Sequence, residues 1–141
     1  MANKIFIDTN ILLDFFDEDR VGSKDGQALL IEISNGSLEA CISESVITTF
    51  DYLLAKTLSK EIRSNIILDL SLVMTILSCD NETVALATKS KFPDFEDAML
   101  YEIAARNEAD YFITNDKSAL KKLGTNDTEV ISCKDFLKLL R

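Results

Sequence analysis

Short, continuous apolar runs alternate along the chain with segments in which apolar residues recur every three or four positions. A continuous run is typical of a strand buried on both faces, whereas the wider spacing is typical of an amphipathic helix. The runs predict strands over residues 4–8, 38–42, 109–114 and 129–132. The wider spacing predicts helices over about residues 23–35, from about residue 44, over 60–75, around 84–87, over 94–107 and over 134–140.

This alternation predicts an α/β fold, a three-layer α/β/α sandwich with a central, mostly parallel sheet of four to five strands. The strand over 109–114 should neighbour the first strand. Gly36 should end the helix over 23–35, because glycine at the C′ position readily takes a left-handed conformation. No repeat, low-complexity segment or linker interrupts residues 1–141, which predicts a single domain.

The composition agrees with a folded, cytoplasmic domain. The 141 residues are 47% hydrophobic and include 4 glycines and 1 proline, which excludes collagen-like and disordered chains. No apolar stretch approaches the roughly 20 residues that span a bilayer, and the N-terminus lacks the apolar core of a signal peptide. The 3 cysteines are widely spaced in apolar surroundings, which predicts buried thiols in a reducing cytosol rather than disulfides or a zinc site.

The charged residues restrict the chemistry further. Histidine is absent, which excludes histidine-based catalytic triads and imidazole metal sites. The 24 acidic residues against 15 basic ones give a net charge of −9, a poor balance for a stand-alone nucleic-acid-binding protein. The chemistry of a functional site therefore has to come from carboxylates, amides and hydroxyls.

Four aspartates stand where a parallel sheet places functional side chains, beyond the carboxyl ends of its strands. Asp8 directly follows the first strand, and Asp116 lies two residues beyond the strand over 109–114. Asp94 and Asp97 open a predicted helix. Each one alone is explained by helix capping. Together they predict an acidic cluster whose repulsion Mg²⁺ or Mn²⁺ would relieve, and such an ion activates water and stabilises charge on a phosphodiester without histidine.

Three segments resemble, in order and spacing, the blocks of PIN-domain proteins. The segment IFIDTNILLD at 5–14 resembles their opening strand, D-T-N turn and apolar helix. The segment DFEDA at 94–98 resembles their third block, and ITND at 113–116 resembles their fourth. The resemblance covers essentially the whole chain and implies the PIN fold. It also implies an endoribonuclease that hydrolyses RNA phosphodiester bonds with Mg²⁺ or Mn²⁺ as its cofactor.

Small single-domain PIN proteins are commonly the toxins of VapBC-type, type II toxin–antitoxin pairs. The resemblance therefore implies three partners: an RNA substrate, a small antitoxin protein, and a second copy of the chain in a homodimer. It implies no association with a membrane.

The resemblance also implies roles for individual residues. The catalytic and metal-binding acids would be Asp8, Asp97 and Asp116. Asn10 and Thr114 would be polar supports that hydrogen-bond the ligands or hold the loop. Asp94 matches no invariant acid of the pattern, and helix capping and metal binding both stay open for it. Glu96 points about 100° away from Asp97 around the helix, so we interpret it as solvated or as a supporting partner.

One position departs from the family pattern. PIN ribonucleases usually carry a glutamate in the helix after the second strand, where this chain has Thr49. Asp51 cannot replace it without a shift in register, because two residues turn a helix by about 200°. Thr49 would serve only as a support. The alternative is a catalytically degenerate PIN-fold module that binds RNA or protein without turnover.

Lysines near the acidic blocks are candidates for contacts with RNA phosphates. Lys89 and Lys91 precede the helix over 94–107, and Lys117 follows Asp116. The competing interpretation is that they are ordinary solvated lysines.

A phosphatase of the haloacid dehalogenase type is a third interpretation, since an Asp-Thr-Asn segment after the first strand also suits that fold. Those enzymes use a second aspartate as the acid–base group two positions after the first. Asn10 cannot transfer a proton, which disfavours this interpretation.

Overall fold

The computed structural model describes residues 3–122 and 127–140, and its centre is a five-stranded sheet in which every pair of neighbours is parallel. The strand order is β3-β2-β1-β4-β5. The strands are β1 (Asn3–Ile7), β2 (Leu38–Ser43), β3 (Met74–Leu77), β4 (Tyr111–Ile113) and β5 (Glu129–Ile131). The predicted α/β class is confirmed, and so is the position of β4 beside β1.

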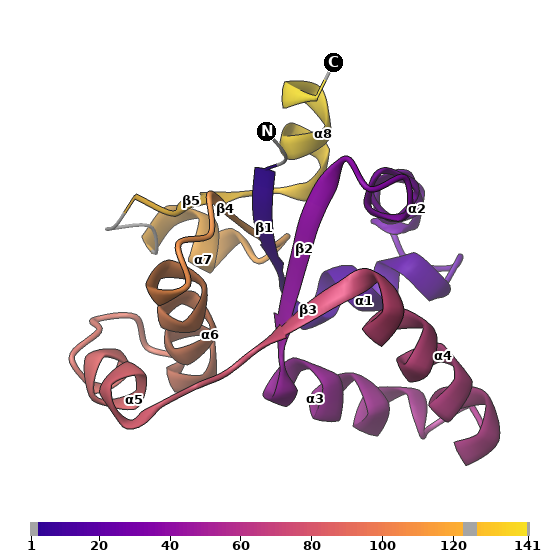
Figure 1. The fold of residues 1–141 in the computed structure, drawn as a ribbon, viewed down its shortest axis with the longest axis horizontal. Coiled ribbons are helices and arrows are strands. Elements are labelled where there is room, and N and C mark those ends of the chain that lie inside the picture. Colours follow the sequence, from indigo (N-terminus) through magenta and orange to yellow (C-terminus); the bar gives the residue numbers. More distant parts are fainter. Residues whose placement is uncertain (1–2, 123–126, 141) are drawn as a thin grey trace.

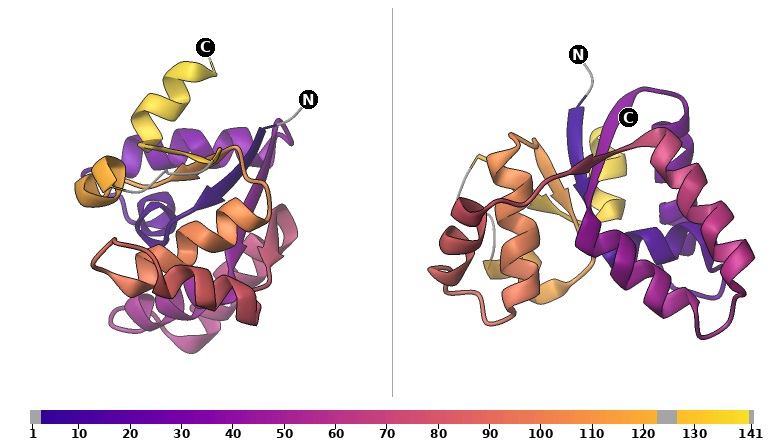
Figure 2. Two further views of the ribbon diagram at one scale, coloured as in Figure 1. Left: turned by 90° about the vertical axis from the view of Figure 1, so that its left-hand side faces the viewer. Right: turned by 60° about the horizontal axis from the view of Figure 1, so that its bottom comes forward.

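Helices cover both faces of the sheet (Figure 1). The described helices are α1 (Thr9–Phe16), α2 (Ser23–Ser34), α3 (Glu44–Leu54), α4 (Lys60–Val73), α5 (Asn81–Thr88), α6 (Phe95–Arg106), α7 (Lys117–Lys122) and α8 (Cys133–Leu139). The α3–α4 pair and the α5–α6 pair lie on opposite sides of the strands, as Figure 2 shows. This division follows from right-handed crossovers, because the chain winds outward from β1 to β3 and then returns to β4.

Local capping explains where several helices begin and end. The side chains of Ser43, Ser59 and Ser132 each accept a backbone N–H from the first turn of the following helix. Gly36 follows the end of α2 with a φ of 78°, in the left-handed region that glycine tolerates. The predicted stop at Gly36 is therefore confirmed.

The predicted elements differ from the structure at two places. The helix predicted over 60–75 ends at Val73, and the next four residues form β3 beside β2. The apolar residues of α4 run directly into the apolar residues of β3, so spacing alone gives no boundary between them. The short helix α7 was not predicted, because its six residues are too few to show a helical period. The other predicted elements agree with the structure to within a few residues.

The core lies on both faces of the sheet. Phe6 and Phe112 are register partners in β1 and β4, and their rings stack with centroids 5.5 Å apart. A second, smaller cluster lies between the α5–α6 pair and α7, and consists of Ala87, Phe92, Ala98 and Ala119. Cys41 and Cys133 are buried, whereas Cys79 is exposed, so the expectation of three buried thiols was wrong for Cys79. No helix in the described part of the chain is both long and apolar enough to cross a bilayer.

Candidate active site

The register of the two central strands brings Asp8 and Thr114 together at the carboxyl edge of the sheet. Ile7 of β1 is paired with Ile113 of β4, so the next residue of each strand emerges at the same level. The backbone N–H of Asp8 donates to the carbonyl of Ile113 at 3.1 Å. The hydroxyl of Thr114 donates to Oδ2 of Asp8 at 2.8 Å, and both side chains are buried. The sheet itself therefore fixes the carboxylate of Asp8.

The same hydroxyl connects Asp8 to Asp116. Oγ1 of Thr114 accepts the backbone N–H of Asp116 at 3.1 Å while it donates to Asp8. Oδ1 of Asp116 in turn accepts the N–H of Ser118 at 2.8 Å, at the start of α7. Thr114 thus hydrogen-bonds two of the predicted acids at once. Oδ2 of Asp116 accepts no protein hydrogen bond within the described residues.

Asp94 and Asp97 open α6 in different roles. Oδ1 of Asp94 accepts the N–H of Asp97 at 3.1 Å, so Asp94 is the N-cap of this helix. Asp97 is half-buried, whereas Asp94 and Glu96 are exposed. The structure therefore shows the capping role of Asp94, and Asp97 is the most buried of the three acids at the start of α6.

Burial is the main influence on the pKa of Asp8. Desolvation raises this pKa, and the negative charges of Asp116 and Glu96 raise it further. Hydrogen bonds from Thr114 and from the N–H of Thr9 act in the opposite direction, but the net pKa stays above the ordinary value. The ionised form of Asp8 is therefore disfavoured in the folded protein.

The pKa of Asp97 is also raised above its ordinary value. Its partial burial, together with nearby negative charges, raises the pKa of Asp97 to about 7. The charges that contribute after desolvation are those of Asp8, Asp94, Asp116 and Glu96. Three elements far apart in sequence, namely the end of β1, the start of α6 and the loop after β4, thus place the predicted acids within one electrostatic environment.

The donor set fits a hard divalent cation. The site offers carboxylate and hydroxyl oxygens, and a cation would favour the ionised carboxylates that burial and repulsion disfavour. Within residues 3–122 and 127–140, no three aspartate, glutamate or cysteine side chains are already gathered into a metal-binding arrangement. Coordination of Mg²⁺ or Mn²⁺ by Asp8, Asp97 and Asp116, with or without Asp94, therefore stays a prediction.

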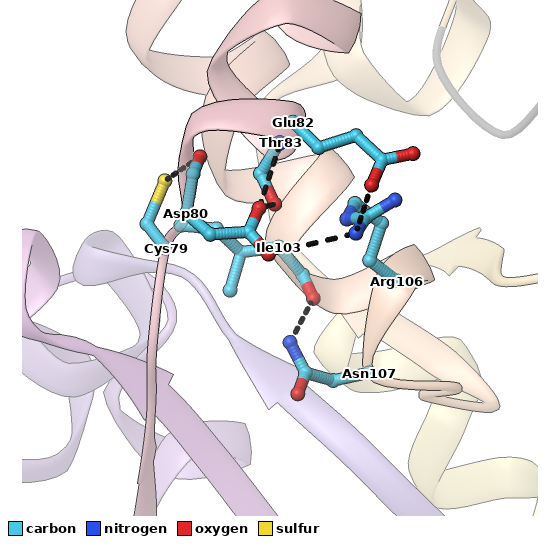
Figure 3. A network of polar contacts seen from close by, with 7 residues as sticks. All are labelled: Cys79, Asp80, Glu82, Thr83, Ile103, Arg106 and Asn107. Atoms are coloured by element: carbon cyan, nitrogen blue, oxygen red, sulfur yellow. Dashed lines mark hydrogen bonds and ion pairs between the residues drawn. The ribbon is translucent and has the colours of Figure 1, made fainter.

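A polar network holds the α5–α6 pair that carries Asp97 (Figure 3). Asp80 caps α5, and Arg106 near the end of α6 donates to Glu82 at 3.2 Å and lies 3.6 Å from Asp80. Hydrogen bonds from Thr83, and then the charge of Arg106, lower the pKa of Asp80. The small core beneath α5 and α6 contains Ala98, the residue after Asp97, and Ala119 of α7, so it packs α6 against the helix that follows Asp116.

The remaining predicted residues lie in other surroundings. Asn10 is exposed and lines a hollow of about 740 Å³ together with Asp116. Thr49 is half-buried in α3. Lys89, Lys91 and Lys117 are exposed, and none of them lines this hollow. Their contacts with RNA therefore stay predictions.

The sequence interpretation missed a polar group in the same hollow. Asp14 of α1 is buried and pairs with Arg20 across 2.7 Å. In the sequence Asp14 is simply the last residue of the opening motif, and Arg20 lies in a loop without a periodic pattern. The useful signal was Gly26, because a Cβ at this position would lie 2.7 Å from Cβ of Asp14. A glycine in the middle of α2 is explained by this close approach of α1.

The chain is similar to known proteins in both sequence and fold. A family model described as PIN domain matches residues 4–118. Ribonuclease VapC1 of Aquifex aeolicus (strain VF5) is 30% identical, over 96% of this chain and 94% of that protein.

Among solved structures, VapBC2 from Rickettsia felis, bound to a DNA fragment from its promoter, superposes with a TM-score of 0.69 and 14% identity, over 92% of this chain and 98% of that one. PAE2754 from Pyrobaculum aerophilum superposes with a TM-score of 0.68 and 17% identity, over 99% of this chain and 96% of that one. These structures share the fold. Since the family model spans all three motif segments and a relative is 30% identical along nearly its whole length, the chain belongs to the PIN-domain family.

Proposed function

We propose that this protein is a divalent-metal-dependent endoribonuclease that acts as the toxin of a type II toxin–antitoxin pair. The observation that carries the proposal is the hydrogen-bonded link from Asp8 through Thr114 to Asp116 at the carboxyl edge of the sheet, where the charges of both acids also raise the pKa of Asp97. Carboxylates that repel each other in a partly buried site are suited to a bound cation. The similarity to Ribonuclease VapC1 supports RNA as the substrate.

The proposal assigns a separate role to each residue of the site. Asp8 and Asp116 would hold the ion, and Asp97 would hold it as well or accept a hydrogen bond from the attacking water. Thr114 keeps Asp8 in place and ties the backbone of Asp116 to it. When bound, Mg²⁺ or Mn²⁺ would lower the pKa of water and stabilise the charge that develops on the phosphodiester. The absence of histidine leaves the carboxylates as the proton-accepting groups of this site.

The proposal is tested with the purified protein and single-stranded RNA of mixed sequence. We expect cleavage with Mn²⁺ or Mg²⁺, no cleavage with EDTA, and recovery when Mn²⁺ is added in excess over EDTA. Cleavage that persists undiminished in EDTA would contradict the proposed dependence on a metal ion. The absence of cleavage under every condition would favour the alternative, a PIN-fold module that binds without turnover.

Thr49 offers a second test of the same site. If residue 49 faces the acids as the family pattern implies, Thr49→Glu adds a carboxylate ligand, and we expect Mn²⁺ to bind about tenfold more tightly. Mn²⁺ affinity is measured by calorimetry. Thr48→Glu is the matched control, because it adds the same charge on the exposed neighbouring position of α3. Equal Mn²⁺ affinities of the two variants would show that residue 49 does not face the site.

The toxin role implies an antitoxin and a homodimer. The similarity of the fold to VapBC2 of Rickettsia felis supports a protein partner of that kind. We expect the product of an adjacent reading frame to co-purify with this chain and to suppress its cleavage of RNA. Light scattering of the isolated chain tests the homodimer, which a monomeric mass would contradict.

A further inference from the structure

A buried carboxylate holds one arginine at the edge of the candidate active site. Oδ1 of Asp14 accepts Nε of Arg20 at 2.7 Å, and Oδ2 of Asp14 accepts the side-chain amide of Asn115 at 3.4 Å. Oδ1 of Asn115 accepts the N–H of Cys133 at 3.3 Å, so the amide is fixed from both ends. Both oxygens of Asp14 are therefore occupied by protein donors, and Asp14 serves as an anchor for Arg20 and not as a free ligand.

The exposure of this ion pair is the reverse of that in a second Arg–Asp pair of the same chain. Nε of Arg63 lies 2.7 Å from Oδ1 of Asp51, the same atoms at the same distance as in the Arg20–Asp14 pair. Arg63 is only 16% exposed and its acid is 41% exposed, whereas Arg20 is 34% exposed and its acid is 4% exposed. In the Arg63–Asp51 pair the arginine is the more buried partner. In the Arg20–Asp14 pair the carboxylate is buried and the arginine is the more exposed partner.

Arg20 lies in the hollow that also contains one of the predicted acids, Asp116. It is the one cation among the described residues that line this hollow, whose other charged residues are Asp14, Asp19, Asp25 and Asp116. Nη2 of Arg20 donates weakly, at 3.5 Å, to the backbone carbonyl of Asn10, two residues after Asp8. Within the described residues Nη1 has no protein acceptor, so it retains its N–H groups for an anion.

We propose that Arg20 binds a phosphate of the RNA backbone and so positions the strand against Asp8, Asp97 and Asp116. This inference rests on the proposed function. A chain with a net charge of −9 repels RNA, and a fixed cation beside the acids would offset this repulsion for a phosphate bound there. Arginine suits this task because its planar fork donates to Asp14 on one side and to phosphate oxygens on the other. Arg20 is thus a substrate-binding residue of the site.

The test compares Arg20→Gln and Arg20→Lys with the control Arg63→Gln, which breaks the equivalent pair between α3 and α4. The affinity for a short, fluorescein-labelled, single-stranded RNA is measured by anisotropy at several salt concentrations, with Ca²⁺ present. For Arg20→Gln we expect about tenfold weaker binding at low salt, and a salt slope reduced by about 0.7, the value for one phosphate contact. Arg20→Lys should retain the salt slope, because it keeps the charge, and Arg63→Gln should bind like the parent.

Cleavage with Mn²⁺ separates this inference from the proposed function. We expect Arg20→Gln to raise KM for RNA with a smaller effect on kcat. Cleavage by the parent with unchanged binding and KM in Arg20→Gln would overturn the role of Arg20 and leave the nuclease intact. A parent that binds RNA through Arg20 but does not cleave it would overturn the nuclease and leave the inference intact. Equal losses of affinity in Arg20→Gln and Arg63→Gln, with equal losses of stability and no change in slope, would show that the pair is structural.

Discussion

Asp8→Asn is expected to reduce Mn²⁺-dependent RNA cleavage by at least about a hundredfold while the protein stays folded. Loss of a group that merely supports a metal ligand typically costs 10- to 100-fold, so loss of a ligand charge should cost at least as much. The asparagine can keep both side-chain contacts of Asp8, with the direction of the hydrogen bond to Thr114 reversed. Its amide oxygen can accept the N–H of Thr9, and its NH₂ group can donate to Oγ1 of Thr114, which has two lone pairs.

The stability of this variant is a second readout of the same substitution. Since burial raises the pKa of Asp8 above its unfolded value, the ionised carboxylate lowers the free energy of unfolding at neutral pH. The neutral amide removes this penalty, so urea unfolding in EDTA should show the variant to be at least as stable as the parent.

Asp110→Asn is the matched control for Asp8→Asn. Asp110 lies just before β4, at the amino ends of the strands, opposite to Asp8. Its Oδ2 accepts the backbone N–H of Lys4 in β1 at 2.9 Å. The two substitutions therefore change the same chemical group beside the same two strands, at opposite ends. Cleavage by Asp110→Asn should equal that of the parent. If Asp8→Asn also cleaves like the parent, the nuclease activity does not reside at the carboxyl edge.

Much of the fold was predictable because the central strands carry strong local signals. The run ending in Ile7 is apolar on both faces, and parallel strands buried on both faces have this pattern. The end of α2 was predictable from Gly36, because a glycine readily takes the left-handed conformation that ends a helix. The boundary at Val73 was not predictable in this way, since pairing with β2, and not a local signal, turns the following residues into β3.

The candidate site was predictable only in part, because only some of its residues stand at places that the sequence pattern marks. Asp8 and Asp116 stand at strand ends, where the position of a residue in the sequence already indicates its place in the fold. Arg20 stands in a loop, and its position depends on a buried carboxylate in a different element, so no spacing within the sequence marks it. Thr114 was expected to be a polar support, but the register of β1 and β4 is what shows that its hydroxyl bridges Asp8 and the backbone of Asp116.

The contribution of Asp97 to the stability of the metal-free protein is expected to become less favourable as the pH rises from about 4 to about 7. The folded-state pKa of Asp97 is raised to about 7, from an ordinary value of 3.8. Between these two values the folded protein retains a proton that the unfolded chain has lost, so each rise in pH favours unfolding. Above about pH 7 the ionised carboxylate contributes the full penalty.

Asp97→Asn removes this penalty and should therefore be more stable than the parent at pH 8, on the order of 1 kcal/mol after allowance for solvent screening. At pH 4 the two proteins should be nearly equal. The measurement is urea unfolding in EDTA from pH 4 to pH 8, and the informative quantity is the difference between variant and parent, in which the other titrating groups cancel.

Asp80→Asn supplies the comparison of opposite sign. The hydrogen bonds from Thr83 and the charge of Arg106 lower the pKa of Asp80, so its ionised form stabilises the folded state at neutral pH, and this contribution is lost as the pH falls below 3.8. Asp80→Asn should accordingly be less stable than the parent at pH 7, while Asp97→Asn is more stable. A difference between Asp97→Asn and the parent that does not change with pH would mean that Asp97 is not crowded by negative charge. The electrostatic basis for a cation at the carboxyl edge of the sheet would then be lost.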